Sequence, residues 1–313
     1  MTITSRLRKE YGLAILLGFE IEVVFMKPVG PAGSRAPLCN HSWCNLTSED
    51  ASILQMIEEV VRKLHVVDAA AEIFHAESAP GQWEFVLSPR TPVEAVDMLL
   101  RARETITVIA YQHGLRAMLH PRPYPEYAGT GAQARKSMHS KHSFHRANIY
   151  GQVSVEEIPY KTMQKYHPAM LTQKILDISA SPLENVTDLE KIESFFGGIL
   201  SHLPSITAFA MPLDISYNRV QTGIWSGGEY VCWGWENREA PLLRITETRF
   251  EFKLMCGTAN PYTTVCSMLV AGIDGLENRL PLLAGDCQGE AANMSAAERY
   301  RLQIMTKLPT SIE

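Results

Sequence analysis

Apolar residues run almost without interruption through residues 13–26, LAILLGFEIEVVFM. Such a run is typical of a strand that is buried on both faces of a sheet. Glu20 and Glu22 interrupt it, and because strand side chains alternate with period two, both carboxylates project to the same face. Two like charges in apolar surroundings are costly unless a cation lies between them. The pattern therefore predicts a central strand that carries part of a binding site.

A second apolar run, residues 82–88, carries another acid, Glu84, and follows a Pro-Gly pair that can reverse the chain. Glu77 lies on the other side of that turn, so both carboxylates are expected to point into one site. A hard metal such as Mg²⁺ or Mn²⁺ would explain acids in a buried strand. Salt-bridged surface acids are the alternative, and four acids on two apolar strands make that alternative the weaker one.

Other stretches have apolar residues at helical spacing. The amphipathic stretch 189–203 runs into Pro204, and the stretch 92–113 ends at Gly114, which suits a helix C-cap. The predicted helices cover residues 5–11, 49–64, 92–113, 161–175 and 189–203, and the further predicted strands cover residues 69–76 and 82–88 and begin again at residue 115.

Cations gather in the second half of the chain, in surroundings that resemble strands. In residues 249–253, RFEFK, charged residues alternate with phenylalanines, so Arg249, Glu251 and Lys253 share one face. Cations opposite an acidic metal site are what a nucleoside triphosphate requires. A salt-bridge ladder on an exposed sheet face is the alternative.

Two further patterns are less specific. The stretch Gly129-Thr130-Gly131 could hold a phosphate, although many tight turns also need glycine. Cys39, His41 and Cys44 resemble half of a zinc site, but no second pair with matching spacing follows. The six cysteines of the chain are therefore expected to be reduced core or loop residues.

Composition adds mainly exclusions. A chain of 313 residues with 46% hydrophobic and 20% charged residues is typical of a globular protein with a substantial core. Its net charge of -5 argues against a nucleic-acid-binding surface. No apolar run approaches the roughly 20 residues that span a bilayer, and residues 1–10 lack the apolar core of a signal peptide. We therefore expect a cytoplasmic protein without membrane contact.

Seven short motifs in this order resemble the catalytic domain of glutamine synthetase, in particular the fungal synthetase-like proteins of the type-I group. The match runs from about residue 17 to 282, with a weaker tail to about 309. The motifs are Gly18-Phe-Glu-Ile-Glu22, Glu77-x-x-Pro-Gly-Gln-x-Glu84, Gly129-Thr-Gly131, Ser216-Tyr-Asn-Arg219, Asn237-Arg238, Arg249-Phe-Glu251 and Ala259-Asn-Pro-Tyr262.

This resemblance implies an α+β fold of the glutamine synthetase/guanido kinase type, with a curved, mainly antiparallel sheet flanked by helices. It implies a single catalytic domain over residues 1–313, with an irregular insert at about 139–185. The small amino-terminal β-domain of the family, which helps to form its ring-shaped oligomer, is not found in this sequence. A homo-oligomer is still expected, but the family ring is in question.

The resemblance also implies ATP, divalent metal ions (Mg²⁺ or Mn²⁺) and a specific set of side chains. The first metal would be held by Glu22, Glu77 and Glu84, and the second by Glu20, Glu251 and Gln133. The nucleotide would be bound by Arg244, Arg249, Arg135, Gly129, Gly131 and Lys253, with Arg238 also facing its phosphates. The implied catalytic residues are Arg238, Arg219 and Glu84, of which Arg219 would bind the substrate carboxylate.

The sequence departs from the family pattern at several of these positions. Gln133 and Arg135 replace a His-x-His pair, so the second metal site is expected to be weaker, and Arg135 could bind phosphate or replace a metal. Lys253 replaces an arginine and loses bidentate recognition of a carboxylate. The flap glutamate that helps to deprotonate ammonium is missing from residues 220–228.

The sequence therefore predicts an ATP-dependent carboxylate–amine ligase that acts on a small amino acid or related carboxylate through an acyl phosphate. The expected acceptor is an amine other than, or larger than, free ammonia. Two alternatives are open: a regulatory or scaffold pseudoenzyme, and an enzyme recruited to amide formation in fungal specialised metabolism.

Overall fold

The computed structural model describes residues 2–29, 34–39, 51–127, 129–132, 134–139, 187–283 and 285–312, without the side chains of residues 51, 52 and 135–139. The chain forms two compact units, one of Met1–Ala14 with His139–Val186 and one of Ile15–Met138 with Thr187–Glu313. In the first unit, helix α1 (Ile3–Tyr11) ends at Gly12, whose φ is +70°. The helix predicted at 161–175 and nearly all of the predicted insert lie outside the described residues.

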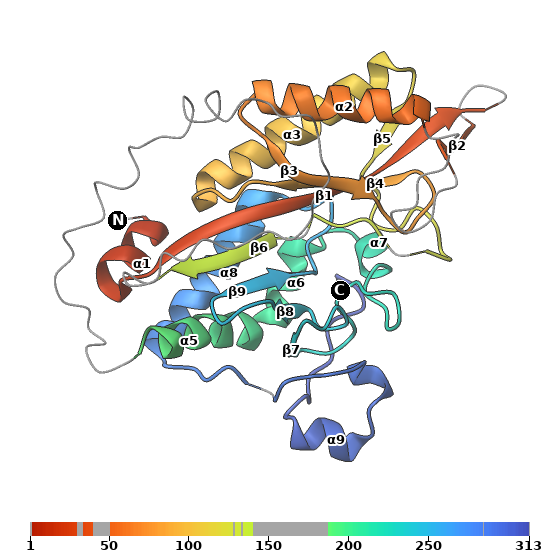
Figure 1. Ribbon diagram of the computed structural model, residues 1–313. Helices are drawn as coiled ribbons and strands as arrows, with labels where there is room; N and C mark the ends of the chain where they lie inside the picture. Colours follow the sequence, from red (N-terminus) through yellow and green to blue (C-terminus); the bar gives the residue numbers. More distant parts are fainter. Residues whose placement is uncertain are drawn as a thin grey trace. The chain divides into compact units, whose positions relative to one another are not determined.

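In the described part of the chain, nine strands form one sheet in the order β3-β4-β1-β6-β9-β8-β7, and β2 and β5 also pair with β1 (Figure 1). The described pairings are antiparallel except that of β7 with β8. The predicted α+β class with a mainly antiparallel sheet is confirmed. The strands are β1 (Ala14–Pro28), β2 (Arg35–Pro37), β3 (Ala71–Ala76), β4 (Gln82–Leu87), β5 (Arg116–Met118), β6 (Ala134–His139), β7 (Trp233–Trp235), β8 (Leu242–Arg244) and β9 (Arg249–Phe252).

Strand β1 is the central strand that the apolar run predicts. Phe19, Ile21 and Val23 are each at most 1% exposed and alternate with Glu20 and Glu22, which are also buried. Because alternate side chains face opposite sides of a sheet, the central part of β1 has one apolar face, with Phe19, Ile21 and Val23, and one face that carries the acids.

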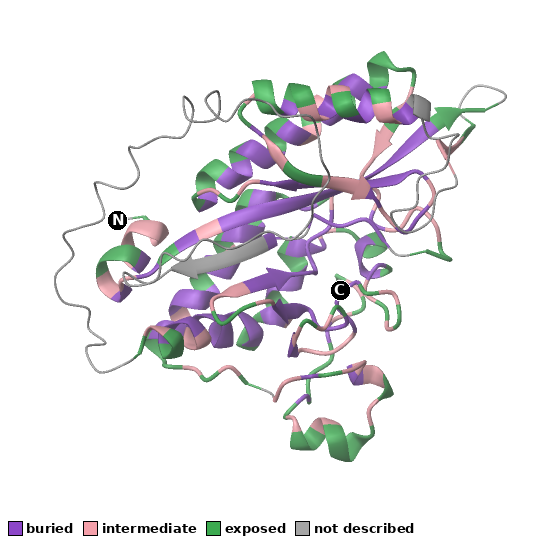
Figure 2. Ribbon diagram, viewed as in Figure 1, coloured by how far each residue is buried: buried purple, intermediate pink, exposed green. Residues whose placement is uncertain are grey.

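The helices of the second unit pack against one another in a connected series. Helix α2 contacts α3, α3 contacts α8, and α8 contacts α5 and α6. Figure 2 shows that β1, β4 and the facing sides of these helices are largely buried. No helix in the described part is long and apolar enough to cross a membrane. The helices are α2 (Ala51–Val66), α3 (Pro92–Gln112), α5 (Asp188–Ser201), α6 (Leu203–Ala210), α7 (Asp214–Tyr217), α8 (Pro261–Glu277), η2 (Ala291–Asn293) and α9 (Ala296–Arg301).

Two helix predictions differ in outcome. Helix α3 agrees with the predicted 92–113, and Gly114 follows it with φ +71°. The helix predicted over 189–203 is α5, which ends at Ser201, and the last predicted residue, Leu203, instead begins α6. Pro204 lies in the first turn of α6, where no intrahelical N–H is required, so this proline begins a second helix.

Helices α5 and α8 meet through two glycines. A Cβ atom on Gly198 would lie 2.1 Å from the carbonyl oxygen of Ala271, and one on Gly275 would come equally close to α5. Two turns of helix can therefore approach more closely than any side chain would permit. Phe196 of α5 also stacks its ring on that of Phe250 of β9, with centroids 3.7 Å apart, and this contact joins α5 to the sheet.

Candidate active site

A three-strand register places the acids of β1 and β4 together. Glu22 lies directly opposite Glu84, and on the other side of β4 Glu84 lies opposite His75. Directly opposed residues of antiparallel strands project to the same face, with Cβ atoms about 5 Å apart. The sheet therefore brings two carboxylates and one imidazole into one row.

The turn between β3 and β4 adds Glu77 to this row. The Glu77 N–H donates to the carbonyl of Gln82 (2.9 Å), and the Phe25 N–H donates to the carbonyl of Gly81 (2.8 Å). Gly81 has φ +72°, and a Cβ atom there would lie 2.8 Å from the Phe25 oxygen. Only glycine fits this position, so the turn that the Pro-Gly pair predicts is locked against β1.

His75, Glu77 and Glu84 form a compact group of possible metal ligands. The His75 Nε2 lies 3.5 Å from Glu84 Oε1, and its Nδ1 lies 3.8 Å from Glu77 Oε1. One ligand atom from each residue lies within 4.8 Å of the other two. Carboxylate oxygens with one imidazole nitrogen suit Mg²⁺ or, better, Mn²⁺.

The pKa shifts of these groups indicate a local excess of negative charge. Burial, followed by repulsion from Glu84 and Glu77, raises the pKa of Glu22 to about 8. Burial and then Glu84 also raise the pKa of Glu77. The hydrogen bond to Glu84 raises the pKa of His75 to about 9, so this imidazole is a cation near neutral pH. A bound divalent cation would stabilise the ionised carboxylates, so the residues fit a metal ion.

Gln82 and the Gly129-Thr130-Gly131 loop hold Glu22 in place. The Oε2 atom of Glu22 accepts from Gln82 Nε2 (3.0 Å) and from the N–H of Gly131 (2.8 Å). Gln82 Nε2 also lies 3.3 Å from the Gly129 oxygen, and the Thr130 N–H donates to the carbonyl of Pro121 (2.9 Å). The loop thus reaches the site, but the N–H groups of Thr130 and Gly131 already donate within the protein.

The residues expected around a second metal are arranged differently. Glu251 is buried and accepts a hydrogen bond from Lys253 Nζ at 2.8 Å, with the two side chains 7% and 5% exposed. Glu20 is buried on β1, and β6 lies between β1 and β9. In the backbone register Arg135 lies opposite Glu251, but its side chain and the whole of Gln133 are outside the described residues. A fixed ammonium group therefore already neutralises Glu251.

Arg219 is enclosed rather than open to a ligand. It is 1% exposed, and its Nε and Nη1 donate to the carbonyls of Thr130 (3.0 Å) and Lys253 (2.6 Å). It follows the short helix α7, not the strand that its surroundings predicted. Its charge also opposes the rise in the pKa of Glu22, so Arg219 contributes electrostatically to the site.

Arg238 lies in the turn after β7 and is exposed. Its guanidinium carbon is 5.7 Å from the centroid of the Trp225 ring, and its charge is among the influences that lower the pKa of Glu77. Trp225 is 47% exposed and has φ +59°, which is unusual for a bulky residue. The Glu239 carboxylate fixes this backbone by accepting from the N–H groups of Gly223 (3.0 Å) and Trp225 (2.6 Å).

The structure does not bring Arg244 to the site. In the register of β8 and β9, Arg244 lies opposite Phe250, on the sheet face that Glu251 does not share. Its guanidinium donates to Glu193 of α5 (2.9 Å) and to the carbonyl of Glu247 (3.1 Å). Arg249, in contrast, alternates with Phe250 and lies on the Glu251 face.

Two residues of this site were not singled out from the sequence. His75 was visible in the spacing, because it precedes Glu77 by two positions and pairs across the turn with Glu84. Gln82 lies within the Pro-Gly-Gln motif, but its contacts with Glu22 and Gly129 depend on tertiary structure.

The chain is similar to known proteins along most of its length. The family described as glutamine synthetase, catalytic domain, matches residues 3–159 and 177–313. Protein fluG of Emericella nidulans is 38% identical over the whole chain, which covers 31% of that protein. A gamma-glutamylpolyamine synthetase of Streptomyces coelicolor is 28% identical over 72% of this chain and 43% of its own length. The type-1 glutamine synthetase 1 of Dictyostelium discoideum is 26% identical over 88% of this chain and 52% of its own length.

Solved structures share the fold. The GmaS/ADP complex superposes with a TM-score of 0.70 at 19% identity, covering 99% of this chain and 64% of that one. A novel glutamine synthase homolog gives 0.67 at 23% identity, covering 99% of this chain and 61% of that one. The chain thus spans about a third to a half of the curated relatives named above and somewhat less than two thirds of these structures.

Proposed function

Because this chain belongs to the glutamine synthetase catalytic-domain family, we propose that it is an ATP-dependent ligase that joins a small amino acid or related carboxylate to an amine through an acyl phosphate. The observation that carries this proposal is the convergence of His75, Glu77 and Glu84 beside Glu22. Such a costly collection of buried acids is best explained by a bound cation.

In this proposal Glu22, Glu77 and Glu84 hold one divalent metal, Mg²⁺ or Mn²⁺. When bound, the metal would neutralise charge on the phosphates of ATP. His75 would either give up its proton and join the ligands or remain a cation that orients Glu84. Gln82 and the Gly131 N–H fix one oxygen of Glu22, so its carboxylate is oriented before any ligand arrives.

The Lys253–Glu251 ion pair supports a reduced second metal site. An ammonium at 2.8 Å from Glu251 supplies the positive charge that a second ion would otherwise bring. Arg135 is registered opposite the same glutamate and would add a further cation. We therefore propose that one metal ion, with Lys253 and Arg135 as fixed cations, serves the phosphates that Arg238 and Arg249 also face.

The acceptor in this proposal is an amine larger than ammonia. Residues 220–228, which lack the flap glutamate, expose the indole of Trp225 beside Arg238. An indole can pack against a carbon chain and can also attract an ammonium group. A substituted amine offers both of these features, whereas ammonia has no carbon chain. The relative from Streptomyces coelicolor is by its name a polyamine ligase, which favours the same class of acceptor.

The test is ATP turnover with Mg²⁺, a panel of small amino acids and a panel of amines. Glu84→Ala and Glu22→Ala should each abolish metal-dependent ADP formation, because the first metal would lose a ligand. Glu58→Ala is the matched control, since this glutamate is 63% exposed on α2. Turnover that survives unchanged in either site variant would reject the assignment.

A second candidate is a pseudoenzyme that binds nucleotide or a metabolite without completing catalysis. The enclosure of Arg219 and the internal pairing of Lys253 favour it, because both cations already have partners. Calorimetric titration with Mg²⁺-ATP and product analysis separate the cases. No binding supports a scaffold, binding with ADP and an amide supports the ligase, and binding with another product supports recruitment to different chemistry. A cytoplasmic location and a homo-oligomer stay predictions.

A further inference from the structure

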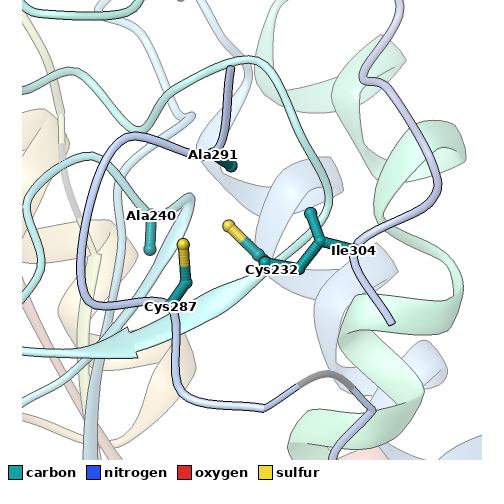
Figure 3. Packing of buried hydrophobic residues seen from close by; sticks show 5 residues of the cluster. All are labelled: Cys232, Ala240, Cys287, Ala291 and Ile304. Atoms are coloured by element: carbon teal, nitrogen blue, oxygen red, sulfur yellow. The ribbon is translucent and has the colours of Figure 1, made fainter. Parts of the chain in front are cut away.

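A small buried cluster outside the acidic row contains two free cysteines. Cys232 lies immediately before β7, and Cys287 belongs to the segment that follows α8; they are 1% and 0% exposed. Figure 3 shows both sulfur atoms pointing into this cluster. Its members are Cys232, Ala240, Cys287, Ala291 and Ile304.

The two thiols contact each other directly. Hydrogen bonding between them lowers the pKa of Cys287 to about 7, and the same bond, together with burial, raises the pKa of Cys232. The backbones are also paired, because the Cys287 N–H donates to the carbonyl of Trp233 at 3.1 Å. A strand-like pairing next to both cysteines keeps their sulfur atoms in reach of one another.

Cys287 is connected to the proposed nucleotide site through Asn237. The Asn237 Nδ2 donates to the carbonyls of Cys287 (2.6 Å) and Gly289 (3.0 Å), and Arg238 is the next residue. The backbones of Gly234 and Cys287 are in close contact, since a Cβ atom on Gly234 would lie 2.3 Å from the Cys287 oxygen. Movement of the Cys287 backbone must therefore move Asn237.

We propose that Cys232 and Cys287 are a redox-active pair that forms a reversible disulfide and thereby repositions the Asn237–Arg238 turn. With a peroxide as oxidant, the Cys287 thiolate attacks the O–O bond and becomes a sulfenic acid, releasing hydroxide. The Cys232 thiol then displaces the sulfenic oxygen as water, so two thiols and one hydrogen peroxide give one disulfide and two waters. A dithiol reductant reverses the change, as a reducing compartment requires.

Access to these buried sulfurs needs only a local opening. The segment 285–308 is joined to residues 229–233 by a short series of backbone bonds, including Val231 N–H to Thr306 O (2.9 Å) and Leu308 N–H to Glu229 O (2.8 Å). Helix α9 within it buries no residue. The buried residues of this segment are Cys287, Ala291, Ile304 and Leu308. A local opening that exposes only these residues costs less free energy than unfolding of the whole domain.

The bond itself explains the coupling to Asn237. A disulfide brings two sulfurs to about 2.05 Å and confines their Cβ atoms to about 3.5–4.5 Å. Two hydrogen-bonded thiols are farther apart than this, so disulfide formation requires side-chain rotation together with a backbone shift, and we expect the Cys287 backbone to take up part of the change. The Cys287 carbonyl, which accepts a short hydrogen bond from Asn237, shifts with it.

The first experiment uses the full wild-type chain and needs no nucleotide. After stoichiometric hydrogen peroxide, peptide mapping by mass spectrometry should find a Cys232–Cys287 linkage that is two hydrogens lighter than the two free peptides and is lost with dithiothreitol. Cys266→Ser is the control, because Cys266 is exposed on α8 and should not affect this linkage. Cys232 and Cys287 still alkylated as free thiols under conditions that oxidise Cys266 would overturn the pair.

The second experiment rests on the proposed nucleotide site. Calorimetric titration with Mg²⁺-ATP should show at least about a fivefold difference in Kd between the oxidised and reduced chains, the lower end of ordinary coupling between sites. Cys232→Ala should bind like the reduced chain before and after peroxide, and circular dichroism confirms its fold. A mapped disulfide with equal Kd values would refute the coupling to Asn237, whereas no binding by either form would count against the proposed function alone.

Discussion

Replacing Glu22 by glutamine should make the metal-free protein less sensitive to alkaline pH. The pKa of Glu22 is about 8 in the folded chain against an ordinary 4.5, so the folded state binds the proton more tightly. This contribution to stability is fully present below about pH 4.5 and is lost as pH rises through 8. A glutamine side chain has the same size and no proton to lose, so the loss should disappear in Glu22→Gln.

The size of the effect follows from the shift. One pKa unit corresponds to about 1.36 kcal/mol, so between pH 5.5 and 8.0 wild type should lose about 3 kcal/mol that the variant keeps. His75 also has a raised pKa, about 9, and pushes stability in the same direction in both proteins. The difference between the two proteins therefore reports Glu22 together with the neighbouring carboxylates that it repels.

The assay is urea unfolding of both proteins in chelator at pH 5.5 and 8.0. Saturating Mn²⁺ at pH 8.0 should restore wild type, because the metal replaces the proton at the carboxylates, and should restore Glu22→Gln much less. Equal pH slopes in chelator, or equal protection by Mn²⁺, would refute the view that Glu22 belongs to a cation site.

Three further results are expected. Arg244→Met should lower the free energy of unfolding by about 1–3 kcal/mol, through the lost bond to Glu193, yet leave the Kd for Mg²⁺-ATP unchanged; a weaker Kd with intact stability would return Arg244 to the nucleotide site. Lys253→Met should cost about 3–5 kcal/mol without metal and raise the Mn²⁺ stoichiometry from one to two by equilibrium dialysis, and a stoichiometry of two in wild type would contradict the ammonium's role. Gly81→Ala should lower the unfolding free energy by at least about 1–2 kcal/mol, and a neutral result in urea would show that the turn adapts.

Much of the fold was predictable because buried strands and helices show a regular spacing of apolar residues in the sequence. Period-two alternation gave β1 and the shared face of Glu20 and Glu22, and the Pro-Gly pair gave the turn between Glu77 and Glu84. These are local rules, in which each residue's direction follows from its neighbours in the chain. The family resemblance then supplied the sheet and the domain type.

The rest depended on information that local patterns lack. The face of Arg244 is set by the register of β8, a strand of three residues between irregular segments, and a one-residue slip exchanges the two faces. Pro204 was interpreted as a stop although proline also begins helices. The enclosure of Arg219 arises only when distant segments meet. The partner of Lys253, in contrast, is Glu251, two residues away on the same strand face.

The paired glycines of α5 and α8 affect residues far from their own contact. A methyl group on Gly198 or Gly275 would clash with the backbone of the other helix, so α5 and α8 would have to move apart. Phe196, which belongs to α5, would then lose its stacking contact with Phe250. Phe250 is the neighbour of Glu251 along β9. One added carbon atom at the contact between α5 and α8 would therefore disturb the packing that supports the ion pair between Glu251 and Lys253. Selection that keeps glycine at these two positions would therefore preserve the packing of two helices and, through it, the geometry of the Glu251–Lys253 pair.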